Sequence, residues 1–154
     1  MKEKLNEFKY FDKFYSLKYI SNFSNKYSHM PFIYVITPTI KKQTQIPDLI
    51  RLKNTLQSVP KVIWILVEDS ENKTKSIKLF LAKSNLNFVH LNTPSINFKN
   101  IQNNKSSGVR HKGVEQRNLG INWLRKNQNK IDLNAVVFFA DDDNTYDTRL
   151  FEEV

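Results

Sequence analysis

The sequence predicts an α/β domain with a mainly parallel β-sheet and helices on both faces of that sheet. Short runs of β-branched and aromatic residues alternate with longer stretches in which apolar residues recur every three or four positions. The runs are almost continuously apolar, which is typical of strands that are covered on both faces. Strands that alternate with helices in this way favour a parallel sheet.

Four strands are expected, at residues 32–36, 62–67, 87–91 and 135–140. The third is the weakest of the four. A Thr-Pro pair stops the first run, a Glu-Asp pair follows the second, and three consecutive aspartates end the fourth.

Three helices are expected, at residues 48–57, 74–83 and 114–127. Pro47 suits the first position of the first helix, where a missing N–H costs nothing. The stripes expected to face the sheet are Ile46, Leu49 or Ile50, Lys53 and Leu56 in the first helix, Ile77, Phe80 and Leu81 in the second, and Val114, Asn118, Ile121 and Leu124 or Arg125 in the third.

The chain divides into a stem or linker at residues 1–30, partly helical, and a domain at residues 31–154. Residues 92–112 form a long polar loop, which is more often functional or mobile than idle. The final residues, Glu152-Glu153-Val154, read as the first turns of another helix, with no capping residue after them. This pattern predicts a domain truncated at its C-terminal end, and therefore a fragment of a larger protein.

The composition fits one globular domain of 154 residues, with 40% hydrophobic residues and 11 phenylalanines. The absence of cysteine excludes disulfides, thiol catalysis and thiolate zinc sites. No stretch approaches the roughly 18 apolar residues of a membrane-spanning helix, and the N-terminus lacks the apolar core of a signal peptide. Any membrane anchor of this protein is therefore expected outside this chain.

The net charge of +9 is unevenly distributed. Residues 141–154 hold six acidic residues against one base, which leaves 23 basic and nine acidic residues in the rest of the chain. A basic body with one acidic edge suits an anionic ligand plus a cation better than a uniform nucleic-acid surface. The bases are mostly lysines among Asn and Ser, without the aromatic pattern of RNA-binding motifs, so no nucleic-acid partner is expected.

The most informative feature is the triplet Asp141-Asp142-Asp143, which directly follows an apolar strand. Adjacent carboxylates repel one another, so a fold tolerates them where a cation or hydrogen-bond donors offset the charge. Oxygen ligands of this kind suit Mg²⁺ or Mn²⁺, which commonly bridge a carboxylate to the phosphates of a substrate. A solvated acidic turn is the alternative.

Two further polar segments are expected beside the triplet, because parallel strands place their carboxyl ends at one edge of the sheet. Pro38 and Thr39 follow the first strand, and Thr39 could donate to a phosphate or a ribose. Asp69 follows the second strand and could accept a hydrogen bond from a base N–H or a ribose hydroxyl. Each has a structural alternative: the first segment is a simple turn, and Asp69 caps the next helix.

Lys112 and Arg117 lie on either side of a glycine at the start of the third helix, where both could face a diphosphate. Solvated surface charge is the alternative for both. The three histidines share no metal-ligand spacing, and no histidine receives a role. The chain has only three glycines and no glycine-rich phosphate loop, which disfavours dinucleotide and P-loop interpretations.

Residues 31–154 closely resemble the β-1,3-glucuronosyltransferases, glycosyltransferase family 43. No single matching motif is specific, but together the motifs occur in order and at the family's spacing. They are Tyr34-Val35-Ile36-Thr37-Pro38-Thr39, Arg51-Leu52 with Asn54-Thr55-Leu56, Trp64-Ile65-Leu66-Val67-Glu68-Asp69, Gly113-Val114-Glu115-Gln116-Arg117-Asn118-Leu119, Asn122-Trp123-Leu124-Arg125, Phe139-Ala140-Asp141-Asp142-Asp143-Asn144-Thr145-Tyr146 and Leu150-Phe151-Glu152-Glu153.

The resemblance implies a GT-A fold that transfers glucuronic acid from UDP-glucuronate to a terminal galactose of a glycan, of proteoglycan-linker type, with Mn²⁺ and inversion. By the same resemblance, Asp69 contacts uracil, Asp142 holds the ribose and Asp143 ligates the metal. Asp141 and Arg117 complete the surroundings of the uridine and the metal, beside Pro38, Thr39 and Lys112. The resemblance also implies a lumenal Golgi location, a membrane-anchored full-length form and a homodimer.

Two positions depart from the family pattern. Lys112 stands where the family usually carries arginine, so the charge is kept but the bidentate geometry is lost. Ile40 stands where the family has a tyrosine that stacks on uracil, and isoleucine offers no aromatic face.

The family's general base is a glutamate of the acceptor-binding half, expected beyond Val154, so no catalytic residue is assigned and this fragment alone is expected to be inactive. The alternatives are a non-catalytic UDP-binding fragment, a GT-A transferase that uses another UDP-sugar and, less favoured, a basic RNA-binding domain.

Overall fold

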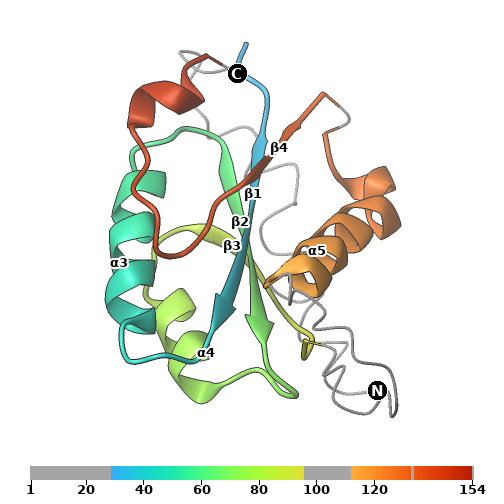
Figure 1. Ribbon diagram of the computed structural model, residues 1–154. Helices are drawn as coiled ribbons and strands as arrows, with labels where there is room; N and C mark the ends of the chain where they lie inside the picture. The colour runs from blue at the N-terminus through green and yellow to red at the C-terminus, as the bar shows by residue number, and fades with distance from the viewer. Residues whose placement is uncertain (1–28, 96–111, 133, 154) are drawn as a thin grey trace, which may run out of the picture.

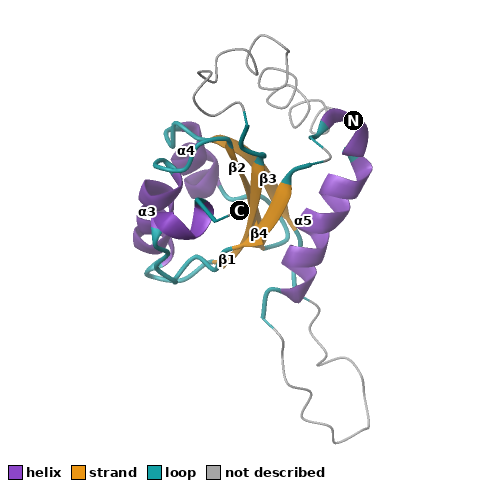
Figure 2. Cartoon of the chain, turned by 90° about the horizontal axis from the view of Figure 1, so that it is seen from above, coloured by secondary structure: helices purple, strands orange, loops and turns teal. Residues whose placement is uncertain are grey.

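The computed structural model describes residues 29–95, 112–132 and 134–153. In these residues, four parallel strands form a sheet in the order β3-β2-β1-β4. Helices α3 and α4 cover one face of the sheet, and α5 covers the other (Figures 1 and 2). The strands are β1 (Ile33–Ile40), β2 (Val62–Asp69), β3 (Asn87–Asn92) and β4 (Val136–Phe139), and the helices are α3 (Gln45–Leu56), α4 (Lys75–Ala82) and α5 (Val114–Lys126). The predicted parallel sheet between two helical layers is confirmed.

Alternate residues of the central strands point to opposite faces of the sheet, which creates two apolar cores. On the α3 and α4 face, Val35 and Trp64 pack with Leu52 and Ile77. On the α5 face, Ile36 and Ile65 pack with Leu124. The near-continuous apolar runs of β1 and β2 therefore serve two cores at once, which explains why the sequence shows no alternation there.

Strand β1 is longer than expected, because it continues through Thr37 and Pro38 to Ile40. The carbonyls of Phe32 and Ile36 accept hydrogen bonds from the β4 side. In a strand the backbone groups of every second residue point the same way, so the nitrogen of Pro38 also points toward β4. Pairing with β4 ends at Ile36. A proline is tolerated here because no neighbouring strand requires its missing N–H.

Helix α3 starts earlier than predicted, at Gln45, so Pro47 is its third residue rather than its first. Proline fits there because the first four N–H groups of a helix have no intrahelical partner. The predicted stripe is correct at Ile46, Leu49 and Leu56. Of the two alternatives, Leu49 and Ile50, Leu49 is buried and Ile50 is exposed. In helix α4 the predicted inward residues are confirmed: Ile77 and Leu81 are buried, and Phe80 packs edge-on against Trp64.

The buried stripe of α5 agrees with the predicted one at Leu124, and the predicted Ile121 packs against the same core, but other positions differ. Gln116, Gly120 and Leu124 face the sheet, whereas Val114 is 43% exposed. A Cβ atom at Gly120 would lie 2.8 Å from Cγ2 of Ile36, so this glycine allows the helix to approach β1 closely. The prediction missed Gln116 and Gly120 because it searched for apolar side chains.

The predicted stem at residues 1–30 and most of the polar loop at residues 92–112 lie outside the described residues. The helix expected at the C-terminal end is a 3-10 turn, η4 (Thr148–Phe151), in which the buried Phe151 packs on Phe138. A second such turn, η3 (Gln128–Lys130), follows α5. In the part of the chain that the structure describes, no helix is long and apolar enough to cross a membrane.

Candidate functional site

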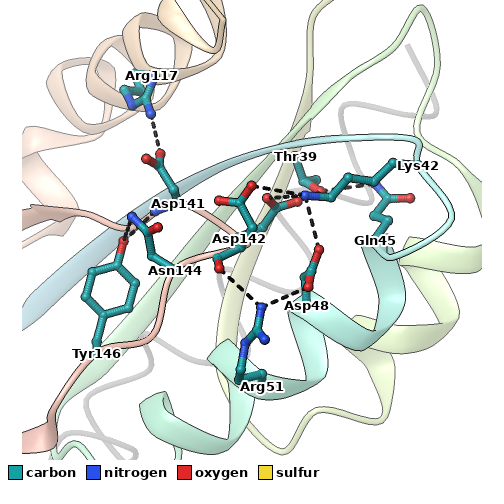
Figure 3. A network of polar contacts seen from close by, with 11 residues as sticks. Thr39, Lys42, Gln45, Asp48, Arg51, Arg117, Asp141, Asp142, Asn144 and Tyr146 are labelled. Carbon is teal, nitrogen blue, oxygen red and sulfur yellow. Dashed lines mark hydrogen bonds and ion pairs between the residues drawn. The ribbon is translucent and has the colours of Figure 1, made fainter.

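The site lies at the edge of the sheet where the parallel strands β1, β2 and β4 end. Figure 3 shows the polar contacts around Asp141 and Asp142 at this edge. Ile40, the last residue of β1, is paired in register with Asp69, the last residue of β2. The aspartate triplet begins two residues after β4 ends at Phe139. The three polar segments predicted to meet at one edge of the sheet therefore do so.

The carboxylates of Asp141 and Asp142 turn toward opposite layers of the fold (Figure 3). Asp141 forms an ion pair with Arg117 of α5. Asp142 is buried on the other side, where its Oδ2 accepts a hydrogen bond from Oγ1 of Thr39 at 2.7 Å and its Oδ1 accepts one from Nζ of Lys42 at 3.1 Å. Asp141 and Asp142 are tolerated side by side because each faces a different cation, Arg117 or Lys42.

Lys42 joins the triplet to helix α3. Its Nζ atom lies 3.1 Å from Oδ2 of Asp48, 3.1 Å from Oδ1 of Asp142 and 3.5 Å from Oδ2 of Asp143. Burial disfavours the ammonium ion, but the hydrogen bonds to Asp142 and Asp48 outweigh it and raise the pKa of Lys42 above its ordinary value. The pKa of Asp48 is lowered, first by a hydrogen bond from Thr44 and then by Lys42.

Arg51, one turn further along α3, supports the same cluster. Its Nη2 atom donates to Oδ1 of Asp48 at 2.9 Å and to the backbone carbonyl of Asp143 at 3.2 Å. Tyr146 holds the other side of the turn, because its hydroxyl accepts a hydrogen bond from the backbone N–H of Asp141 at 2.7 Å. These contacts fix the backbone of the triplet before any ligand is present.

Gly113 shapes the start of α5 beside the sheet edge. Its φ angle is +79°, a conformation that glycine adopts without strain. A Cβ atom there would lie 2.7 Å from Nη1 of Arg117 and 3.1 Å from Cβ of Pro38. Glycine therefore leaves room for the Arg117 side chain, which reaches Asp141 and also donates from Nη1 to the carbonyl of Lys112 at 3.1 Å.

Asp69 lies on the α5 side of the edge, and the segment after β3 holds it. The backbone N–H of Ser95 donates to Oδ1 of Asp69 at 2.7 Å, and the Ser95 hydroxyl donates to Oδ2. Gln116, fully buried in α5, donates from Nε2 to the Thr93 carbonyl at 2.8 Å and so anchors this segment. Ile40 is 48% exposed next to Asp69 and presents an apolar surface there.

Comparisons with known proteins identify the family of this chain. A model of glycosyltransferase family 43 matches residues 52–154. The mouse galactosylgalactosylxylosylprotein 3-beta-glucuronosyltransferase 3 is 41% identical over 134 residues, which cover 81% of this chain and 40% of that protein. The sqv-8 protein of Caenorhabditis elegans, also a galactosylgalactosylxylosylprotein 3-beta-glucuronosyltransferase, is 40% identical over 124 residues, covering 80% of this chain and 35% of that protein. The chain belongs to glycosyltransferase family 43.

The family 43 chain spans only about 40% of the length of the mouse relative. Family membership and the parallel sheet confirm the predicted fold class, an α/β fold of GT-A type. Among solved structures, TarS 1-349 of S. aureus matches with a TM-score of 0.48 and 16% identity over 79% of this chain and 30% of that one, a likeness too distant to inform function.

A divalent metal would have to bind this family 43 site through few protein ligands. Among the described residues, no three acidic or histidine side chains form a ready metal cluster. The Asp143 side chain is 62% exposed and turned toward Lys42 at 3.5 Å, so its oxygens remain accessible. One accessible carboxylate fits Mg²⁺ or Mn²⁺ held mainly by substrate phosphates. The residues present are therefore compatible with the metal that the family implies.

The sequence interpretation missed several residues of the site, namely Lys42, Gln45, Asp48, Arg51, Ser95, Gln116 and Tyr146. The spacing of Asp48 and Arg51, three residues apart at a helix start, is a signal that could have indicated one of these contacts. The side chain of Lys112, a predicted ligand residue, is exposed. Its backbone carbonyl accepts the hydrogen bond from Nη1 of Arg117.

Proposed function

We propose that this chain is the donor-binding part of a transferase that moves glucuronic acid from UDP-glucuronate to a terminal galactose of a glycan, with inversion and with Mn²⁺. Family 43 membership supports the reaction class, and the printed names of the relatives support glucuronate transfer to a galactosyl-galactosyl-xylosyl chain. The observation that carries the proposal is that Asp69 at the end of β2 and Asp142 and Asp143 after β4 lie at the same edge of the sheet, where parallel α/β sheets bind their ligands.

Each part of the donor has a candidate partner. Asp69 and Ile40 are adjacent and offer an acceptor and an apolar surface to the base. Asp142, held by Thr39, offers a preorganised carboxylate to the ribose hydroxyls. Arg117 and Lys112 supply positive charge on the α5 side for the diphosphate.

Asp143 would hold the metal, since its carboxylate is the most accessible of the triplet. When bound, the metal neutralises charge on the diphosphate and makes UDP a better leaving group. The protein contributes the fixed backbone of the triplet, through Arg51 and Tyr146, and so holds the carboxylates in place.

The acceptor side is proposed to lie outside this chain. An inverting transfer needs a general base near the acceptor hydroxyl, and we assign that role to none of the described residues. Because the aligned region is 40% of the mouse relative, we propose that the remainder carries the base and the acceptor site. A lumenal Golgi location, a membrane-anchored full-length form and a homodimer are proposed on the same family basis.

Isothermal titration with UDP, with and without Mn²⁺, tests the donor site. The isosteric change Asp143→Asn should abolish the Mn²⁺-dependent part of UDP binding. Glu153→Gln, which removes one charge from an exposed carboxylate of the same segment, should not. UDP binding that is absent, or that ignores Asp143→Asn, would contradict the proposal. Salt-sensitive RNA binding that also ignores the change would favour a different function.

A further inference from the structure

The ammonium group of Lys42 lies inside the carboxylate cluster rather than at its rim. It contacts Asp48 and Asp142 at 3.1 Å and Asp143 at 3.5 Å, and its side chain is 29% exposed (Figure 3). Of these three acids, Asp142 and Asp143 are the ones proposed to hold the ribose and the metal. A positive charge therefore already lies beside the place where a divalent cation would bind.

The charges of this cluster nearly balance without any ligand. Three carboxylates, those of Asp48, Asp142 and Asp143, face two cations, Lys42 and Arg51. A divalent cation added alone would make the cluster net positive and would lie close to the Lys42 ammonium. A diphosphate that arrives with the metal reverses this excess, and it also gives Lys42 an anionic partner.

We propose that Lys42 couples the two ligands of the donor site, so that the divalent cation binds weakly by itself and tightly only together with a nucleoside diphosphate. The inference rests on the proposed function. Its basis is that the Lys42 ammonium pairs with Asp142 and Asp143 in the unliganded protein and there opposes the metal. A bound diphosphate offers the ammonium another anionic partner and so weakens this opposition, which couples the two ligands. Lys42 thus sets how strongly the metal and the diphosphate depend on each other for binding, rather than only the affinity of each one.

The neighbouring contacts allow Lys42 to be replaced without dismantling the cluster. Asp142 keeps its hydrogen bond from Thr39, and Asp48 keeps its ion pair with Arg51. Arg51 also keeps its bond to the backbone carbonyl of Asp143. A change at Lys42 therefore removes one charge while the positions of the carboxylates stay supported.

The experiment measures the Mn²⁺ dissociation constant with and without saturating UDP, by titration calorimetry and by the electron paramagnetic resonance signal of free Mn²⁺. The ratio of the two constants is the coupling factor. In Lys42→Met, Mn²⁺ alone should bind about tenfold more tightly, because a repelling charge within a few ångströms is gone. The coupling factor should fall by about tenfold or more.

Lys41→Met is the matched control, since it removes the same charge from the exposed neighbouring residue. Its coupling factor should change by less than about twofold, because solvent and salt screen that charge. Lys42→Arg keeps the charge and should keep the coupling. If circular dichroism shows that Lys42→Met is unfolded, Lys42→Gln provides the same comparison with a hydrogen-bond donor retained.

A purely structural role for Lys42 predicts weaker binding of both ligands and an unchanged coupling factor, and that result would overturn the inference. An equal change in Lys41→Met and Lys42→Met would overturn it as well. If the unmodified protein shows no Mn²⁺-dependent UDP binding, the proposed function fails and the coupling fails with it. If Mn²⁺-dependent binding is present and Lys42→Met leaves the coupling intact, only the role of Lys42 is wrong.

Discussion

Oγ1 of Thr39 donates a hydrogen bond to Oδ2 of Asp142 at 2.7 Å, across 103 residues of sequence. Both residues are buried, and Nε2 of Gln45 in turn donates to the Thr39 hydroxyl at 3.1 Å. This chain of hydrogen bonds joins β1, α3 and the turn after β4. It orients the Asp142 carboxylate in the unliganded protein, so no reorganisation is needed when a ligand arrives.

Thr39→Val tests this link. Valine keeps the shape but leaves a buried carboxylate with one donor fewer, so the free energy of unfolding should fall by about 1–3 kcal/mol. UDP should also bind more weakly. Urea unfolding and titration with UDP measure the two effects. Thr39→Ser should restore both, and a valine variant as stable as the original protein would show that the bond contributes nothing.

Gly113→Ala tests the start of α5. The left-handed backbone costs a non-glycine residue about 1–2 kcal/mol, and the new Cβ would lie 2.7 Å from Nη1 of Arg117. We expect a lower free energy of unfolding together with weaker UDP binding, because the Arg117 side chain is displaced. In an Arg117→Ala background the stability penalty should shrink to the backbone strain and the close contact with Pro38, and a double-mutant cycle measures the difference. Equal penalties in both backgrounds would contradict the contact.

Asp69→Ala tests recognition of the base. The loss of a charged acceptor should weaken UDP binding about tenfold or more, equally with and without Mn²⁺. Ser95→Ala keeps the Asp69 carboxylate and its hydrogen bond from the backbone N–H of residue 95, and removes only the bond from the Ser95 hydroxyl. Its effect on UDP binding should therefore be smaller. Pyrophosphate, which has no base, should bind all three proteins alike. Unchanged UDP affinity in Asp69→Ala would refute the role of this residue.

The Glu68–His90 pair predicts an acid-dependent loss of stability. Burial of Glu68 opposes ionisation, but hydrogen bonds with His90 and with Thr74 outweigh it, so the pKa of Glu68 is lowered. A lowered pKa stabilises the fold above the ordinary glutamate value of about 4.3, and this stabilisation is lost as the pH falls toward the folded pKa.

We measure the free energy of unfolding by urea at pH 7 and near pH 3.5. Its decrease between the two pH values should be smaller for Glu68→Gln than for the original protein. Glu71→Gln, an exposed acid of the following loop, is the control and should behave like the original protein. A decrease of the same size in Glu68→Gln would place the acid-sensitive contact elsewhere.

Much of the fold could be predicted because β1 and β2 are apolar on both faces, which itself indicates a doubly covered parallel sheet. The features that were missed depend on contacts that a local pattern does not contain. Pro38 remains inside β1 only because β4 ends early. Helix α5 turns Gly120 toward the sheet because Ile36 needs the space.

The candidate site likewise combines features that the sequence predicted with features that it did not. The positions of the strand ends predicted correctly that Thr39, Asp69 and the aspartate triplet lie at one edge of the sheet, because a parallel topology alone brings them there. Lys42 was not predicted, because a single lysine among 24 basic residues carries no local signal. Only the fold brings it to Asp48 on one side and Asp142 on the other.

Paramagnetic broadening of amide NMR signals by Mn²⁺ in the presence of UDP tests the central claim most directly. If Asp143 holds the metal of a donor site, broadening should be strongest at Asp142 to Asn144 and at the end of β1 near Thr39, and Asp143→Asn should remove it. Broadening centred away from this sheet edge, or broadening that persists in Asp143→Asn, would contradict the assignment.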